Sequence, residues 1–264
     1  MPLIDGPDCK LSVEVLGEGD PVTVFAHGVT GSTWDLRPLA RYVRGTRVLF
    51  DFRGHGDSES PEESAGYDHA AARRDLECVA DAFSATQAFG VSWGAGALCN
   101  LLQDVPNRFS RLGFFIPACL DEPNRGAGHF PAFAAVLESH PIDEVVARTL
   151  RAPEYEALFA VRPYWRELVR KRTERMNGKG VPRALRGYVA GDPPLRDAEV
   201  LRAVTAPALI LSHEGDPVHD ASVARRMAEM LPNTEVVIWP EPLAMYDDLE
   251  GFTRVIGEFF NAGT

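Results

Sequence analysis

The segment 90–94 (GVSWG) is the feature that most constrains the fold of this chain. It follows an apolar run, residues 85–91, and leads into a helix-like run, residues 94–102. Glycines on both sides of a serine allow a tight turn from a strand into a helix, and such a turn exposes the serine hydroxyl. The segment therefore predicts a buried strand that ends at a candidate nucleophile, Ser92. The alternative is a solvated serine in a chance motif.

Strand-like and helix-like runs alternate along much of the chain. This order is typical of a mostly parallel sheet covered by helices. We expect strands at residues 10–16, 21–26, 46–52, 85–91, 111–119, 208–212 and 234–239. We expect helices at residues 34–43, 69–83, 94–102, 221–231 and 249–260.

The rhythm changes between residues 121 and 202, where no strand-like run occurs and prolines break helix-like pieces. We therefore expect two units. A core domain would consist of residues 1–120 and 203–264, and residues 121–202 would form a helical cap inserted into it.

Composition narrows the functional classes. The 264 residues carry a net charge of −11, which argues against sequence-independent nucleic-acid binding. The four cysteines form no C-x-x-C pair, so we expect neither a disulfide framework nor a zinc site. The absence of a signal-peptide pattern and of a long apolar span favours a cytoplasmic protein that does not contact membranes. We expect a small-molecule substrate, no metal and no cofactor, and leave the oligomeric state open.

Four motifs, in this order, resemble the α/β-hydrolase superfamily over essentially the whole chain. They are residues 27–32 (HGVTGS), 51–58 (DFRGHGDS), 90–94 (GVSWG) and 214–219 (EGDPVH). The resemblance implies an eight-stranded, mostly parallel sheet with an inserted helical cap.

The resemblance also assigns roles to individual residues. Ser92 would be the nucleophile, and the backbone N–H groups of Trp93 and Val29 would form the oxyanion hole. Asp216 would orient and stabilise the catalytic histidine. Asp121, after the strand at 111–119, is a second candidate for the acid.

The histidine that the resemblance implies, after the last strand, is missing. The segment 240–245 (PEPLAM) contains none, and Ala244 stands at the vacated position. His213, three residues before Asp216, is the best substitute base, although a buried histidine bonded to backbone is the simpler interpretation. His219 is expected to begin a helix at the surface.

Further candidates lie in the motif at residues 27–32 and in the cap. His27 and Gly28 of that motif, and Tyr164 and Trp165 of the cap, are candidates for substrate binding. His129 and His140 are cap histidines whose direction the sequence leaves open. Nine basic residues should mostly form a solvated helix face, while one or two arginines would bind a carboxylate or phosphate of the substrate. They are Arg162, Arg166, Arg170, Lys171, Arg172, Arg175, Lys179, Arg183 and Arg186.

The sequence therefore favours a cofactor-independent hydrolase of a small ester, lactone or thioester, acting through Ser92 with an incomplete or atypical triad. Because the base is missing from its usual place, ordinary esterase activity is expected to be weak. Two alternatives remain. One is a lyase, isomerase or cyclase of secondary metabolism on the same scaffold, and the other is an inactive, ligand-binding pseudo-hydrolase.

Overall fold

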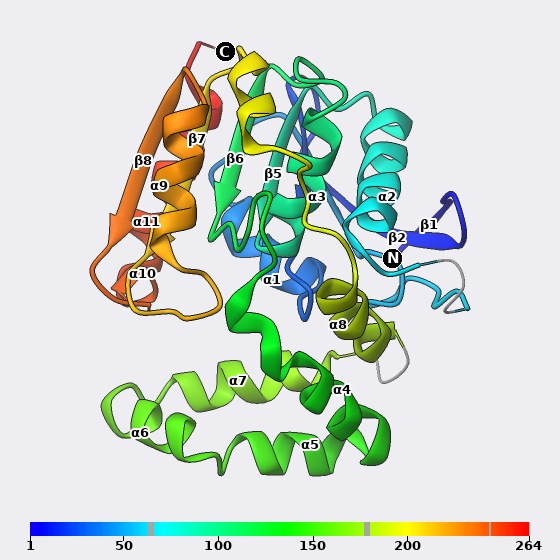
Figure 1. The fold of residues 1–264 in the computed structure, drawn as a ribbon, viewed down its shortest axis with the longest axis vertical. Helices are drawn as coiled ribbons and strands as arrows, with labels where there is room; N and C mark the ends of the chain where they lie inside the picture. Colours follow the sequence, from blue (N-terminus) through cyan, green and yellow to red (C-terminus); the bar gives the residue numbers. More distant parts are fainter. Residues whose placement is uncertain (63–65, 177–179, 243, 264) are drawn as a thin grey trace.

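An eight-stranded sheet organises the computed structural model, which describes residues 1–62, 66–176, 180–242 and 244–263 (Figure 1). The strands are β1 (Leu3–Asp5), β2 (Lys10–Leu16), β3 (Val22–Ala26), β4 (Thr46–Phe50), β5 (Gln87–Val91), β6 (Arg111–Phe115), β7 (Ala208–His213) and β8 (Thr234–Trp239). Their order is β1-β2-β4-β3-β5-β6-β7-β8. Strand β2 is antiparallel to both neighbours, and all other pairs are parallel. The expected eight-stranded, mostly parallel sheet is confirmed.

Helices cover both faces of the sheet, because alternate residues of its central strands are apolar on each side. Phe25, Leu49 and Phe89 are fully buried in one core with residues of α1 and α11. Val24 and Phe114 are buried in the other, with residues of α2, α3 and α9. The covering helices are α1 (Thr33–Leu39), α2 (His69–Ala82), α3 (Trp93–Leu102), α9 (Ala221–Met230) and α11 (Leu249–Asn261).

Several strands differ from the sequence expectation. The short strand β1 was not anticipated, β4 stops at Phe50 instead of residue 52, and β5 begins at Gln87 instead of residue 85. Strand β6 stops at Phe115 instead of continuing to residue 119. Ile116 has φ of 46°, a conformation that a β-branched residue rarely adopts, and its N–H donates to the carbonyl of Leu211 at 2.7 Å. The strand therefore ends at a sharp bend.

Between β6 and β7 the chain is helical. It forms α4 (Phe130–Ser139), α5 (Ile142–Thr149), α6 (Pro153–Val161), α7 (Trp165–Glu174) and α8 (Gly180–Ala190). Prolines lie in the first turns of α4 and α6, where no backbone N–H is needed. Figure 1 shows α4 to α7 beyond the end of the sheet to which β6 and β8 point. In parallel sheets, ligands bind at this carboxyl end.

Several negative findings concern the described residues alone. No helix among them is long and apolar enough to cross a membrane. Within the same residues, no three histidine, cysteine or acidic side chains are grouped to hold a metal ion. All four cysteines are free thiols.

A buried ion pair joins the turn at residues 51–58 to helix α2. Arg53 and Asp75 both have fully buried side chains, with Nη2 2.7 Å from Oδ1 and Nε 2.9 Å from Oδ2. The backbone N–H of Arg53 also donates to Asp75, at 3.0 Å. Asp51, at the start of the turn, accepts the backbone N–H of Thr33 at 2.7 Å. The turn is therefore tied to α2 and to α1.

We predict that Arg53→Met lowers the free energy of unfolding by about 3–5 kcal/mol, because it leaves Asp75 charged and buried without its partner. Urea denaturation measures the change. The control is Arg37→Met, which removes an exposed ion pair with Glu14 and should cost less than about 1 kcal/mol. Equal losses in the two variants would contradict the role given to the buried pair.

Candidate active site

The backbone at Ser92 is a sharp turn between β5 and α3. Its φ of 51° and ψ of −107° lie in a region that non-glycine residues rarely occupy. Such strain costs on the order of 1–3 kcal/mol and persists only where the surroundings enforce it. The N–H of Ser92 donates to the carbonyl of Phe115 in β6 at 2.9 Å. The expected strained turn is therefore present.

Three glycines let the chain approach itself closely around Ser92. A Cβ on Gly90 would lie 2.6 Å from the carbonyl oxygen of Gly94, and one on Gly94 would lie 2.5 Å from that of Ala26. The Cβ position of Gly28 is 3.4 Å from Cβ of Ser92. A side chain at residue 90 would therefore push α3 away from β5, and one at residue 94 would push it away from the end of β3. Gly28 lies directly against the serine.

Ser92 has a histidine partner, and it is His219. The serine Oγ lies 2.9 Å from Nε2 of His219, whose Nδ1 lies 2.8 Å from Oδ2 of Asp216. The expectation that His219 begins a surface helix is wrong. Helix α9 begins at Ala221, capped by Asp220, and the His219 side chain is only 16% exposed.

A tight turn directs the imidazole of His219 back toward the sheet. Oδ1 of Asp216 accepts the backbone N–H groups of Val218 and His219, at 2.8 and 3.3 Å. An ionised carboxylate can only accept hydrogen bonds, so Nδ1 of His219 carries a proton. Its Nε2 then presents a lone pair to the hydroxyl of Ser92, which donates. One aspartate thus fixes both the backbone and the tautomer of the histidine.

The same hydrogen bonds keep Asp216 ionised. Burial by itself would raise the pKa of this carboxyl group. The side chain of His219 and the backbone N–H groups of Val218 and His219 outweigh burial and hold the pKa at about 2. Asp216 therefore places a stable negative charge beside the imidazole of His219.

His213, the expected substitute base, contacts the acid instead of the serine. Its side chain is 5% exposed, with Nε2 3.9 Å from Oδ2 of Asp216 and Nδ1 3.4 Å from the carbonyl oxygen of Glu214. Burial lowers its pKa. His219, not His213, thus occupies the place beside Ser92.

Ala244, the vacated histidine position, begins the short helix α10 (Ala244–Asp247). This segment contacts the cap. Nη2 of Arg162 lies 2.5 Å from Asp247 and 2.9 Å from Glu241, and the hydroxyl of Tyr164 donates to Asp247 at 3.0 Å. The contacts of Tyr164 therefore join the cap to α10. They do not bring Tyr164 to Ser92.

Two further candidates are Trp165, for substrate binding, and Asp121, for the acid. Their contacts are with residues other than Ser92 and His219. The ring of Trp165 lies beside that of Tyr164, with centroids 6.2 Å apart. Asp121 pairs with Arg226 at 2.8 Å and accepts the N–H of Ala198 at 3.0 Å. Neither contact involves a histidine, so Asp216 is the acid that the geometry favours.

Two backbone N–H groups near Ser92 are available to an oxyanion. No hydrogen bond within the described part of the chain uses the N–H of Val29 or of Trp93. His55 holds the Val29 loop, with Nε2 2.7 Å from the Val29 carbonyl. Val29 and Trp93 are the residues named from the sequence as oxyanion donors, and that role stays a prediction.

His27 supports this loop from inside. Its Nδ1 is 2.7 Å from the carbonyl of Gly28, and its Nε2 accepts the N–H of Phe52 at 3.1 Å. Burial above all, and then the neighbouring His55, hold its pKa well below the ordinary value. The ring is fully buried and both nitrogens are used, so the expectation that His27 binds substrate is corrected.

The other histidines also bond to backbone. His69, His129 and His140 each direct Nδ1 to a backbone carbonyl, of Asp192, Gly126 and Val136 respectively. His219 therefore differs from the other six in that both ring nitrogens meet side chains.

The loop that carries His219 is supported from the opposite side by Asn124. The Asn124 amide donates to the carbonyl of Val218 and to the hydroxyl of Tyr188 in α8, both at 2.9 Å. Its Oδ1 accepts the N–H of Gly126 at 2.9 Å. A Cβ on Gly126 would overlap the carbonyl of Pro217. The start of the cap is thus pressed against the residues between Asp216 and His219.

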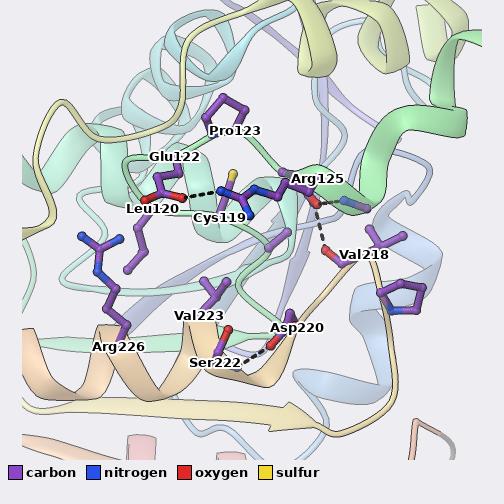
Figure 2. Close-up of a pocket in the computed structure, with 14 residues that line it drawn as sticks. Cys119, Leu120, Glu122, Pro123, Arg125, Val218, Asp220, Ser222, Val223 and Arg226 are labelled. Carbon is purple, nitrogen blue, oxygen red and sulfur yellow. Dashed lines mark hydrogen bonds and ion pairs between the residues drawn. The ribbon is translucent and has the colours of Figure 1, made fainter.

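A cavity of about 410 Å³ lies beside this contact (Figure 2). Cys119 and Leu120 line one side of it, and Val223 and Arg226 of α9 line the other. Val218 is part of the lining, but Ser92 is not. The cavity therefore borders the back of the loop that carries His219.

Comparison with known proteins gives the family. The profile of the Alpha/beta hydrolase family matches residues 23–242. The chain belongs to this family. No curated protein sequence matches it significantly.

Solved structures share the whole fold of this alpha/beta hydrolase at low identity. An enol-lactonase from Burkholderia xenovorans LB400 is 17% identical with a TM-score of 0.79, over 98% of this chain and 99% of that one. A thermophilic esterase from Thermogutta terrifontis is 18% identical with a TM-score of 0.79, over 98% and 97%. An esterase from Exiguobacterium antarcticum is 18% identical with a TM-score of 0.78, over 98% and 99%.

We predict that Asp216 contributes stability to this alpha/beta hydrolase that disappears in acid. Its pKa of about 2 in the folded chain lies below the value of about 3.9 in an unfolded one. The contribution is therefore fully present above about pH 4 and is lost as pH falls toward 2. The difference in unfolding free energy between the wild type and Asp216→Asn should shrink over that interval. A difference that is constant from pH 5 to 2.5 would contradict this.

We also predict that Asn124 positions the histidine. Asn124→Ala should lower kcat about 10-fold or more with little change in KM, because small misplacements of catalytic groups are costly. Asn124→Asp, which keeps the acceptor for Gly126 but loses the donor to Val218, should be as damaging. Asn107→Ala is the control, since Asn107 bonds to Thr205 instead. Unchanged kcat in both Asn124 variants would contradict the prediction.

Proposed function

We propose that this chain is a serine hydrolase of small carboxylic esters, lactones or thioesters. The observation that carries the proposal is the row of side chains from Ser92 through His219 to Asp216, with contacts of 2.9 and 2.8 Å. A serine hydroxyl is a weak nucleophile until an adjacent base accepts its proton, and this row supplies that base.

The proposed reaction follows from the positions of these groups. His219 Nε2 takes the proton of Ser92 as Oγ attacks the carbonyl carbon of the substrate. The carbonyl oxygen becomes negative and is stabilised by the N–H groups of Val29 and Trp93. His219 then protonates the leaving group, and an acyl ester of Ser92 remains. A water molecule, deprotonated by His219, releases the acid by the same steps in reverse order.

Asp216 stabilises the imidazolium that forms during both steps. Its carboxylate is ionised and bonded to Nδ1, so the positive charge develops next to a fixed negative one. The strained turn at Ser92 also supports the proposal, because strained residues cluster at active sites.

The names of structural neighbours agree in reaction class, since they include an enol-lactonase and two esterases. Weak esterase activity was expected only because the base was missing from its usual place. With His219 as base, we expect turnover in the ordinary range for enzymes, about 1–10³ per second on a good substrate. No observation favours a lyase, isomerase, cyclase or inactive protein.

The proposal predicts a sharp difference between two neighbouring histidines. His219→Ala should lower kcat on p-nitrophenyl butyrate at least about 10³-fold, because the serine loses its base. His213→Ala should change kcat less than about 10-fold, since the contacts of His213 are with Asp216 and the Glu214 carbonyl, not with Ser92. The opposite ranking would show that the base is His213. Equal, small effects of the two substitutions would exclude both histidines as the base.

A covalent probe tests the nucleophile separately. A fluorophosphonate should label Ser92 rapidly in the wild type, and peptide mass spectrometry locates the adduct. Labelling should be lost in Ser92→Ala and slowed in His219→Ala. Absence of labelling at Ser92 in the wild type would defeat the proposed mechanism.

A further inference from the structure

The basic residues of the cap have different interaction partners. Arg170 and Lys171 pair with Glu167 on their own helix, and Arg162 pairs with α10. Arg186 pairs with Glu138 of α4. Arg166 and Arg175 lie over the rings of Phe159 and Trp34, and Arg183 donates to the carbonyl of Pro61. Lys179 lies outside the described residues. Arg172 contacts the loop beside Ser92.

The guanidinium of Arg172 reaches from α7 in the cap to the candidate oxyanion loop. Its Nη2 donates to Oγ1 of Thr30 at 3.2 Å. Thr30 follows Val29, one of the two candidate oxyanion donors, and consecutive Cα atoms lie about 3.8 Å apart. Gly28, at the other end of the same short segment, lies against Ser92. Arg172 thus brings a positive charge from the cap to the immediate neighbourhood of the proposed reaction.

Two contacts of Arg172 in the core, with Thr30 and Asp35, are ones that a ligand can replace. Thr30 offers a neutral hydroxyl. The acidic neighbour, Asp35, is 3.7 Å from Nε, and its other oxygen accepts the N–H of Ser32 at 2.9 Å, as the cap of α1. The Arg172 side chain is 49% exposed, so its ion pair with Asp35 is weak. A carboxylate that bonds two guanidinium N–H groups at once is a stronger partner.

We propose that Arg172 binds a carboxylate of the substrate, so that the enzyme prefers esters or lactones that carry a second, ionised carboxyl group a few bonds from the scissile carbonyl. This inference rests on the proposed hydrolase function. It assigns the substrate class through one cap residue, Arg172, whose contact with Thr30 lies next to Val29.

Two matched substrates test the inference. Monoethyl glutarate and ethyl pentanoate carry five-carbon acyl chains that differ in a terminal carboxylate, and a pH-stat records their hydrolysis. Arg172→Gln should lower kcat/KM for monoethyl glutarate about 10- to 100-fold, mainly through KM, because a charged hydrogen bond is lost. Activity on ethyl pentanoate should change less than about threefold, and Arg172→Lys should recover part of the loss.

The control is Arg170→Gln, two residues away on the same helix, where the arginine pairs with Glu167 and Glu174. This variant should leave kcat/KM unchanged for both substrates. Equal losses on the two substrates in Arg172→Gln would show that Arg172 only joins the cap to the core, and no loss on either would also overturn the inference.

Binding separates this inference from the proposed function. If the wild type hydrolyses neither ester, the proposed function fails, and calorimetry with glutarate then decides the role of Arg172. Binding that weakens about 10-fold or more in Arg172→Gln supports the carboxylate site. Binding that is absent, or equal in the two proteins, overturns it.

Discussion

The sharp turn at Ser92 depends on close contact between the backbone of α3 and the end of β3. Gly94 allows this contact, because a Cβ there would lie 2.5 Å from the carbonyl of Ala26, and the N–H of Gly94 donates to the carbonyl of His27 at 3.1 Å. The same contact brings the segment from His27 to Thr30 beside the serine. The strained serine, the two free N–H donors and the loop that Arg172 contacts are therefore products of one packing arrangement.

The proposed acid and base, Asp216 and His219, occupy one short turn after β7, and the segment after β8 has another task. That segment carries Glu241 and Asp247, which bind Arg162 of the cap. Pro242 packs near Gly215, with its Cδ 3.7 Å from the Cβ position of the glycine. The resemblance to α/β hydrolases implies a histidine in this loop. In this chain the loop instead connects the cap to the loop of Asp216. An alanine at residue 244 is therefore compatible with hydrogen bonds from Ser92 to His219 and from His219 to Asp216.

The fold and half of the site could be predicted from sequence, because both depend on local patterns. Apolar runs marked most strands, and glycine spacing marked the turn at Ser92. The contact of His219 with Ser92 was not predicted, because the order of motifs along the chain places the base after β8, whereas loops after β7 and β8 are neighbours in space. A local signal was available: an aspartate followed by Pro-Val-His can cap its own turn and return the histidine to the carboxylate, as Asp216 does. The contacts of Arg172 and Asn124 span distant segments, and no local pattern encodes them.

The position of His219 also explains why β6 is short. Ser92 follows β5 and His219 follows β7, so the imidazole must cross the end of β6, which lies between them. A strand that continued to residue 119 would occupy that path. The left-handed conformation of Ile116 ends β6 at Phe115, and the hydrogen bonds from Ser92 to Phe115 and from Ile116 to Leu211 tie the three strand ends together. The distance from Ser92 to His219 is thus set by three consecutive strands of one sheet, β5, β6 and β7. The proposed base and acid lie on a single turn after β7 and need no second loop to align them, which is a direct form of preorganisation.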